Sequence, residues 1–236
     1  MGSSVFERRC AFVFAHYDDS ILDAAQAMMR CAPGSIDIVL CSGVPERTSR
    51  GRTVEGSWDL TCGYPDPWTA MEARVAEHDN VCRSFSIATA GLGDLDSQYG
   101  TSGSATRLAA RTAAVAHLRA NDIEVVVTHG PWATHPDHVR ASRLAISAAQ
   151  AVGVPVMTVC DRPYTDCSDG CTRASFVGNH MTTTLDDDQW RTKSDAVGKY
   201  AGQLVALTAS FGEGWADRSR LGVECAHEDV TRSPSW

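Results

Sequence analysis

Near its amino terminus the chain reads Cys10-Ala-Phe-Val-Phe-Ala-His16-Tyr17-Asp18-Asp19-Ser20-Ile-Leu-Asp23. A short apolar run ends abruptly in a histidine and two adjacent carboxylates. Apolar residues then recur at helical spacing, at Ile21, Leu22, Ala25, Met28 and Met29. This pattern predicts a buried strand, a tight polar turn and then a helix. In open α/β sheets, ligands and catalytic groups lie at the turn that follows a strand.

The polar turn offers ligands for a metal ion. His16 and Asp19 can face one point as nitrogen and oxygen ligands, and zinc accepts both types. Asp18 would then remain beside the metal, free to act as a base. The alternative to a metal site is that these residues only cap the helix or lie in a solvated loop.

A second cluster, His135-Pro136-Asp137-His138, follows an apolar run at residues 125–127 and precedes another helical pattern. Pro136 suits the first turn of a helix, where a missing N–H leaves no bond unmade. His138 would lie in that turn, where the helix dipole disfavours imidazolium and favours the neutral imidazole that a metal needs. With His16 and Asp19 it gives three protein ligands and leaves a position for water, as in catalytic zinc sites.

These two motifs resemble those of the PIG-L/LmbE-like superfamily of zinc-dependent N-acetylglucosaminyl deacetylases. That family carries Ala-His-Pro-Asp-Asp-Glu after its first strand and His-Pro-Asp-His near mid-chain. Here the second motif matches at all four positions, and the first reads Ala15-His16-Tyr17-Asp18-Asp19-Ser20. Tyr17 replaces the usual proline and Ser20 the usual glutamate, so no implied ligand or base is lost. A variable residue in place of the glutamate is typical of branches that tailor specialised metabolites such as glycopeptide or nucleoside antibiotics.

The resemblance implies roles for six residues. Zn²⁺, or another divalent metal such as Fe²⁺, would bind His16, Asp19 and His138. Asp18 would be the general base. His135 would be the electrophilic or acidic group near the scissile carbonyl, oriented by Asp137. The motif also favours His138 over His129, a competing ligand that we interpret as a pocket or core histidine.

Further residues are expected to contact the substrate. The pair Arg74-x-x-Glu77 lies where the family has an Arg-x-x-Glu pair, although a surface ion pair of little energetic worth would look the same. Asp96 falls where family members bind sugar hydroxyls, and Lys193 to Gln203 resembles a late helix motif. The full predicted set is Tyr17, Arg74, Asp96, Arg162 and Tyr164.

The rest of the chain alternates between strand and helix patterns. Strands are expected at residues 36–41, 124–128 and 154–160 and near residue 86, and helices at 68–82 and 104–121 and from about 188 to 207. This order predicts an α/β fold, a Rossmann-like three-layer sandwich with a mainly parallel sheet. We expect one catalytic domain over residues 1–236. No Gly-x-Gly-x-x-Gly opens the first helix, which argues against dinucleotide binding.

Composition excludes several classes of function. The chain has 236 residues, 43% of them hydrophobic, and a net charge of −8, which argues against binding to nucleic acid or anionic membranes. It contains no run of 18 apolar residues and no signal-peptide pattern at residues 1–9, so we expect a cytoplasmic location. Nine cysteines suggest buried thiols. Cys160, Cys167 and Cys171 could instead form a disulfide or a second metal site.

Together these features predict a zinc-dependent hydrolase that removes an N-acetyl or other N-acyl group from an amino sugar. The substrate would be a small glycosylated metabolite in specialised-metabolite, antibiotic-type biosynthesis, and the enzyme could be a homo-oligomer. One alternative is an amidase that acts on a larger thiol conjugate or acyl amide at the same site. Another is a non-catalytic binder of small molecules. Specificity is expected in the loops at 42–67, 91–103 and 161–175.

Overall fold

The computed structural model describes residues 7–46, 57–165 and 180–228. Seven strands form one sheet: β1 (Cys10–Phe14), β2 (Ile36–Val39), β3 (Ala88–Gly91), β4 (Val125–His129), β5 (Val156–Val159), β6 (His180–Thr184) and β7 (Val223–Glu228). The longer helices are α1 (Asp19–Arg30), α3 (Pro67–Ser84), α4 (Ser104–Ala120), α5 (Pro136–Val152), α6 (Asp187–Val197) and α7 (Ala201–Phe211). Short helical turns are α2 (Trp58–Thr61), η2 (Ser97–Tyr99), η3 (Glu213–Ala216) and α8 (Arg218–Leu221).

The sheet is mostly parallel. Its strand order is β3-β2-β1-β4-β5-β7-β6, and the first five strands run parallel, with Ala11 of β1 opposite Ile36 of β2 and Val126 of β4. β7 is antiparallel to both β5 and β6. The predicted α/β class with a mainly parallel sheet is therefore confirmed.

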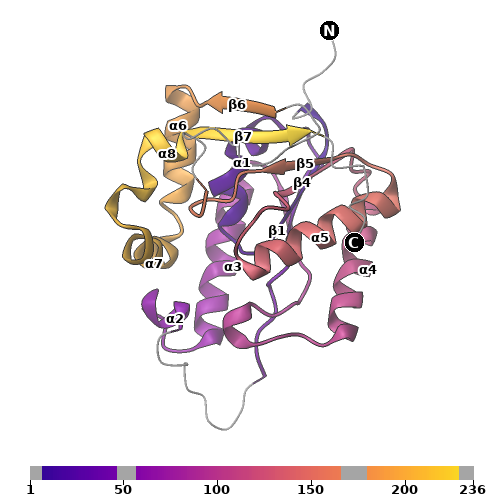
Figure 1. Cartoon of the computed structure of the whole chain (residues 1–236), viewed down its shortest axis with the longest axis horizontal. Coiled ribbons are helices and arrows are strands. Elements are labelled where there is room, and N and C mark those ends of the chain that lie inside the picture. Colours follow the sequence, from indigo (N-terminus) through magenta and orange to yellow (C-terminus); the bar gives the residue numbers. More distant parts are fainter. Residues whose placement is uncertain (1–6, 47–56, 166–179, 229–236) are drawn as a thin grey trace.

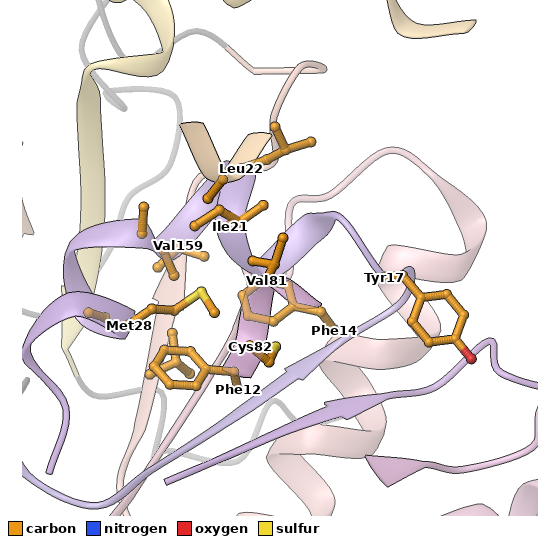
Figure 2. Packing of buried hydrophobic residues seen from close by; sticks show 14 of the residues in the cluster. Phe12, Phe14, Tyr17, Ile21, Leu22, Met28, Val81, Cys82 and Val159 are labelled. Carbon is orange, nitrogen blue, oxygen red and sulfur yellow. The ribbon is translucent and has the colours of Figure 1, made fainter. Parts of the chain in front are cut away.

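Helices cover both faces of the sheet. Because side chains alternate along a strand, Phe12 and Phe14 of β1 pack against α1 and α3, as Figure 2 shows for Ile21, Met28 and Val81. Ala11 and Val13 lie in a second cluster with side chains of α4 and α5. α4 and α5 contact each other along one face, and α6 lies against α1 on the other (Figure 1). This confirms the three-layer sandwich.

The carboxy-terminal third differs from the sequence prediction. The single helix expected to run to about residue 207 is two helices, because α6 ends at Val197, with Gly198 as its C-cap, and α7 begins only after Tyr200. Glycine is a poor helix former, which favours a break there. β6 and β7 were not predicted at all. Cys167 and Cys171 and parts of the loops at 42–67 and 161–175 lie outside the described residues.

The topology fixes one edge of the sheet as the place for a site. β1 and β4 are adjacent, yet the chain leaves them toward opposite faces, through α1 and α5. Ligands of open α/β sheets bind at the carboxyl ends of strands at such a switch point. None of the helices in the described ranges has the length and apolar character needed to cross a membrane.

Candidate metal centre and active site

The turn after β1 is built around a buried carboxylate. Asp19 is the first residue of α1 and is only 4% exposed. Its Oδ2 accepts a hydrogen bond of 2.7 Å from the backbone N–H of His16, which closes the turn. Burial acts to raise the pKa of Asp19, but the imidazoles of His138 and His129 hold that pKa well below its usual range. Asp19 is therefore an ionised carboxylate, ready to act as a ligand.

Three of the predicted ligand atoms form a compact triangle. His16 Nδ1 lies 3.1 Å from His138 Nε2 and 3.5 Å from Asp19 Oδ2, and the third side, from His138 Nε2 to Asp19 Oδ2, is 3.6 Å. Ligands held about 2.0–2.2 Å from a tetrahedral zinc lie about 3.3–3.6 Å from one another. The donor set and its spacing thus fit a zinc-sized divalent ion.

A carboxylate backs each of the two histidines. His16 Nε2 lies 3.3 Å from Asp137 Oδ2, and His138 Nδ1 lies 2.5 Å from Asp161 Oδ1. These contacts place the imidazole proton on the far nitrogen, which leaves His16 Nδ1 and His138 Nε2 with lone pairs for a metal. Carboxylate–histidine–metal arrangements of this kind orient the ring and raise its basicity.

Asp137 is itself held firmly. Its Oδ2 accepts from Ser97 N–H at 2.9 Å and its Oδ1 from Arg140 at 2.7 Å. Asp137 was predicted to orient His135. The contact between them is made by the backbone N–H of Asp137, which donates to His135 Nδ1 at 3.3 Å. Its carboxylate orients His16 instead, a role that the sequence did not predict.

His129 lies directly behind the triangle. Its ring stacks on that of His138, with centroids 4.0 Å apart and planes 10° apart, and it is fully buried. Its Nε2 lies 3.1 Å from Asp19 Oδ2 but also accepts from the backbone N–H of Ala15 at 3.3 Å. The preference for His138 as ligand and for His129 as a pocket or core histidine stays a prediction, and the geometry is compatible with it.

Two further titratable groups line the cavity beside the triangle. Asp18 is 8% exposed, and its carboxylate does not cap α1 and accepts no hydrogen bond from another residue in the described part of the chain. Burial, and then the charge of Asp19, raises the pKa of Asp18. Burial, and then His16 and His138, lowers the pKa of His135. A proton acceptor and a neutral imidazole therefore face one cavity.

The cavity has a volume of about 270 Å³. Its lining includes the three predicted metal ligands, the predicted catalytic residues Asp18 and His135, and the predicted substrate-contact residues. Arg74 on its wall is 4% exposed and does not pair with Glu77 at the surface. Its Nη2 donates to Asp59 Oδ1 at 2.5 Å, and its Nη1 lies 3.8 Å from Asp96 Oδ2. Asp96 also receives both the backbone and the side-chain N–H of Gln98.

The remaining predicted contact residues also line the cavity. Tyr17 is 7% exposed, and burial raises the pKa of its hydroxyl to about 12. Tyr164 is partly exposed, and its ring lies against His135 and His138. The Arg162 guanidinium donates to the backbone carbonyls of Arg220 and Val223, so it supports the chain near β7 while other atoms of the residue border the cavity.

The sequence reasoning missed two carboxylates. Asp161 is the second residue after β5, just as His16 is the second residue after β1. The rule that functional groups follow strand ends could therefore have found it. Asp59 lies in the long connection and is fully buried between Arg74 and Tyr99, whose hydroxyl donates to it at 2.6 Å. No local pattern marks Asp59.

Comparisons with known proteins agree with this geometry. A triple mutant of the deacetylase Orf2 of the teicoplanin biosynthetic pathway is similar in structure, with a TM-score of 0.74 and 18% sequence identity over 94% of this chain and 99% of that chain. The A40926 pseudoaglycone deacetylase Dbv21 has a TM-score of 0.74 and 18% identity over 94% of this chain and 97% of that chain. The 4-carboxy-2-hydroxymuconate hydratase GalB of Pseudomonas putida KT2440 has a TM-score of 0.54 and 17% identity over 98% of this chain and 99% of that chain. At these identities the likeness establishes a shared fold and nothing more.

Sequence comparison assigns the family. No curated protein sequence shows a significant match to the chain. The model of the family PIG-L, described as GlcNAc-PI de-N-acetylase, matches residues 11–149, which is more than half of the chain and includes both histidine motifs. The predicted resemblance is confirmed: this chain belongs to the PIG-L family of de-N-acetylases.

Proposed function

We propose that this chain is a zinc-dependent N-deacetylase that hydrolyses the N-acetyl group of an amino sugar carried by a glycosylated metabolite. The observation that carries the proposal is the triangle of His16 Nδ1, Asp19 Oδ2 and His138 Nε2, beside the carboxylate of Asp18 on the wall of the same cavity. Family membership supports the amide reaction, and the two antibiotic-pathway deacetylases of the same fold support the substrate class.

Zinc suits the donor set, since it accepts imidazole nitrogen and carboxylate oxygen, and three protein ligands leave a fourth position open. A zinc ion held there supplies Lewis acidity, which can lower the pKa of water from 15.7 to about 7. The protein holds its own ligands ready for this, because Asp137 and Asp161 keep the protons of His16 and His138 on the far nitrogens.

Asp18 would take the proton from the attacking water. Its carboxylate lies on the cavity wall, next to the ligand Asp19, and no hydrogen bond from another described residue occupies it. The same carboxyl group can then pass the proton to the departing amine nitrogen. Such general acid–base help contributes about 10²–10⁴-fold to the rate.

His135 would stabilise the oxygen of the amide as negative charge develops on it. Its Nδ1 accepts a hydrogen bond from the Asp137 backbone, so in the neutral ring the proton is on Nε2. An N–H aimed at a developing oxyanion is a strong catalytic element. The lowered pKa of His135 keeps the ring in this neutral form at neutral pH.

The sugar would bind beside the triangle, where Asp96 Oδ2 lies 3.9 Å from His16 Nε2. Arg74 and Asp96 present a guanidinium and a carboxylate, which suit the hydroxyl groups of a saccharide. The cavity volume of about 270 Å³ is at the small end of the roughly 300–1,000 Å³ usual for ligand pockets. It therefore suits one acetylated sugar better than a whole glycosylated metabolite.

The test is acetate release from an N-acetylglucosamine glycoside, measured beside metal content. We expect turnover in the native protein and a loss of about 10²–10⁴-fold in Asp18→Asn, with metal content unchanged. Asp188→Asn, an exposed residue of α6, is the matched control and should keep native activity. Full activity in Asp18→Asn would refute the base assignment. Faster cleavage of a long-chain acyl amide than of the acetyl amide would favour the larger-amide alternative.

A further inference from the structure

A second cluster of possible ligands lies in the core, away from the cavity. Asp37 on β2 faces His78 and Cys82, which are one turn apart on α3. Asp37, His78 and Cys82 are 0%, 1% and 1% exposed, respectively, and none of them lines the cavity described above. Figure 2 shows Cys82 among the buried side chains around Phe12 and Phe14. We call these three residues the sealed cluster.

The atoms of the sealed cluster are close together. Cys82 Sγ lies 3.6 Å from His78 Nε2 and 3.8 Å from Asp37 Oδ2, and His78 Nε2 lies 4.0 Å from Asp37 Oδ1. A sulfur and a nitrogen bound to one tetrahedral zinc are about 3.5–3.6 Å apart. Cys82 Sγ also lies 3.8 Å from His78 Nδ1, so the sulfur lies over the imidazole ring, and a shared metal ion would require the Cys82 or His78 side chain to rotate.

The hydrogen bonds around His78 fix which of its nitrogens is free. The hydroxyl of Tyr200 donates to the backbone carbonyl of Tyr17 at 2.9 Å, and a carbonyl can only accept. Tyr200 has a single hydroxyl proton, so its oxygen must accept in the 3.3 Å contact with His78 Nδ1. His78 therefore carries a proton on Nδ1, and in the neutral ring Nε2 carries the lone pair that a metal ion needs.

The sealed cluster is then short of positive charge. The Cys82 thiol is a weak donor with one proton, and it faces two acceptors, His78 Nε2 and Asp37 Oδ2. Asp37 Oδ1 has no geometrically good hydrogen bond among the described residues, and the hydroxyl of Ser20 is its polar neighbour. Burying an unpaired carboxylate is expensive unless a cation or a proton compensates it.

We propose that Asp37, His78 and Cys82 bind a second divalent cation, zinc by preference, at a structural site distinct from the catalytic centre. Thiolate, imidazole and carboxylate are the three ligand types that zinc combines in proteins. Binding expels the thiol proton of Cys82 to solvent, and Ser20 Oγ or a water completes the four ligands. The site is closed to substrate, as structural zinc sites are. It would tie α3 to β2.

The test begins with a measurement on the native holoprotein that needs no variant. X-ray absorption at the zinc edge should detect sulfur at about 2.3 Å in addition to nitrogen and oxygen at about 2.0–2.2 Å, because the triangle of His16, Asp19 and His138 contains no sulfur. Elemental analysis should find about two zinc ions per chain. A single zinc ion without a sulfur neighbour would overturn the proposal and assign the cluster to an imidazolium–carboxylate pair.

Variants then assign the sulfur. Cys82→Ala should lose one zinc ion and the sulfur signal, and Asp37→Asn should lower the zinc content in the same way if Cys82→Ala does not fold. Cys41→Ser is the matched control, because Cys41 lines the cavity near His16. Asp19→Ala should remove only the sulfur-free zinc, which separates this proposal from the proposed function. A sulfur signal that survives Cys82→Ala but not Cys41→Ser or Cys167→Ser would refute the proposal.

Discussion

Two polar clusters of similar chemistry lie at different depths in this protein. The triangle of His16, Asp19 and His138, which we call the open cluster, borders a cavity, and the His16 side chain is 22% exposed. The sealed cluster is at most 1% exposed. Each combines one aspartate with two softer ligands. Access to substrate therefore separates the two sites more clearly than ligand type does.

The residues that surround the two clusters also differ. Carboxylates back both histidines of the open cluster, Asp137 behind His16 and Asp161 behind His138. A neutral tyrosine hydroxyl backs the histidine of the sealed cluster. A carboxylate partner raises the basicity of a ligating imidazole more than a hydroxyl does. These partners suit the open cluster to the proposed catalytic metal, which must stay bound while one coordination position exchanges with solvent and substrate.

The largest expected effect comes from removing the ligand carboxylate of the open cluster. Asp19→Ala deletes one of the three proposed ligands and the acceptor of the His16 N–H bond, so it should lose the catalytic metal and reduce acetate release below detection. Metal analysis and the acetate assay measure both effects. Asp188→Asn is the control for an aspartate far from the site. Retention of both metal and turnover in Asp19→Ala would mean that Asp19 is not a ligand.

An intermediate effect is expected from Asp161→Asn. The amide oxygen can still accept the His138 Nδ1 proton, so the change removes the negative charge and little else. Loss of such a partner typically weakens metal affinity by about 10–100-fold. Competition with a chelator measures this for the open cluster. Unchanged affinity would show that the charge of Asp161 is unimportant and would weaken the contrast between the two clusters.

Much of the open cluster was predictable because its residues follow apolar strands within short motifs. The period of the apolar residues marks where β1 and β4 end; His16 is the second residue after β1, and the His135–His138 motif follows β4 after a short loop. The parallel arrangement of the two strands then brings the motifs together. Asp161 required knowledge that β5 is the next strand beside β4, and Asp59 has no local pattern at all.

The sealed cluster and the last strands were beyond such reasoning for a different reason. Asp37 lies within an apolar strand pattern and Cys82 within a helix, where single polar residues usually point to solvent or fill the core. Only the packing of α3 on β2 brings them together. β6 and β7 pair with each other and with β5 in antiparallel fashion, which no alternation of strands and helices predicts.

The smallest expected effect tests the link between the clusters. Tyr200 is fully buried, and its hydroxyl joins the Tyr17 carbonyl of the catalytic turn to His78 of the sealed cluster. Tyr200→Phe leaves that carbonyl and the His78 Nδ1–H without partners, which should lower the free energy of unfolding by about 1–3 kcal/mol. Denaturant titration measures this, with Tyr64→Phe at a partly exposed position as the control.

The same variant separates a structural link from a catalytic one. Because the hydrogen bonds of the Tyr200 hydroxyl go to Tyr17 and His78 and not to the open cluster, Tyr200→Phe should keep the sulfur-free zinc and lose far less turnover than Asp18→Asn. It should weaken zinc binding at the sealed cluster, since His78 loses the partner that fixes its proton on Nδ1. Loss of turnover as severe as in Asp18→Asn, in a folded protein, would instead mean that the position of the Tyr17 carbonyl controls the catalytic turn.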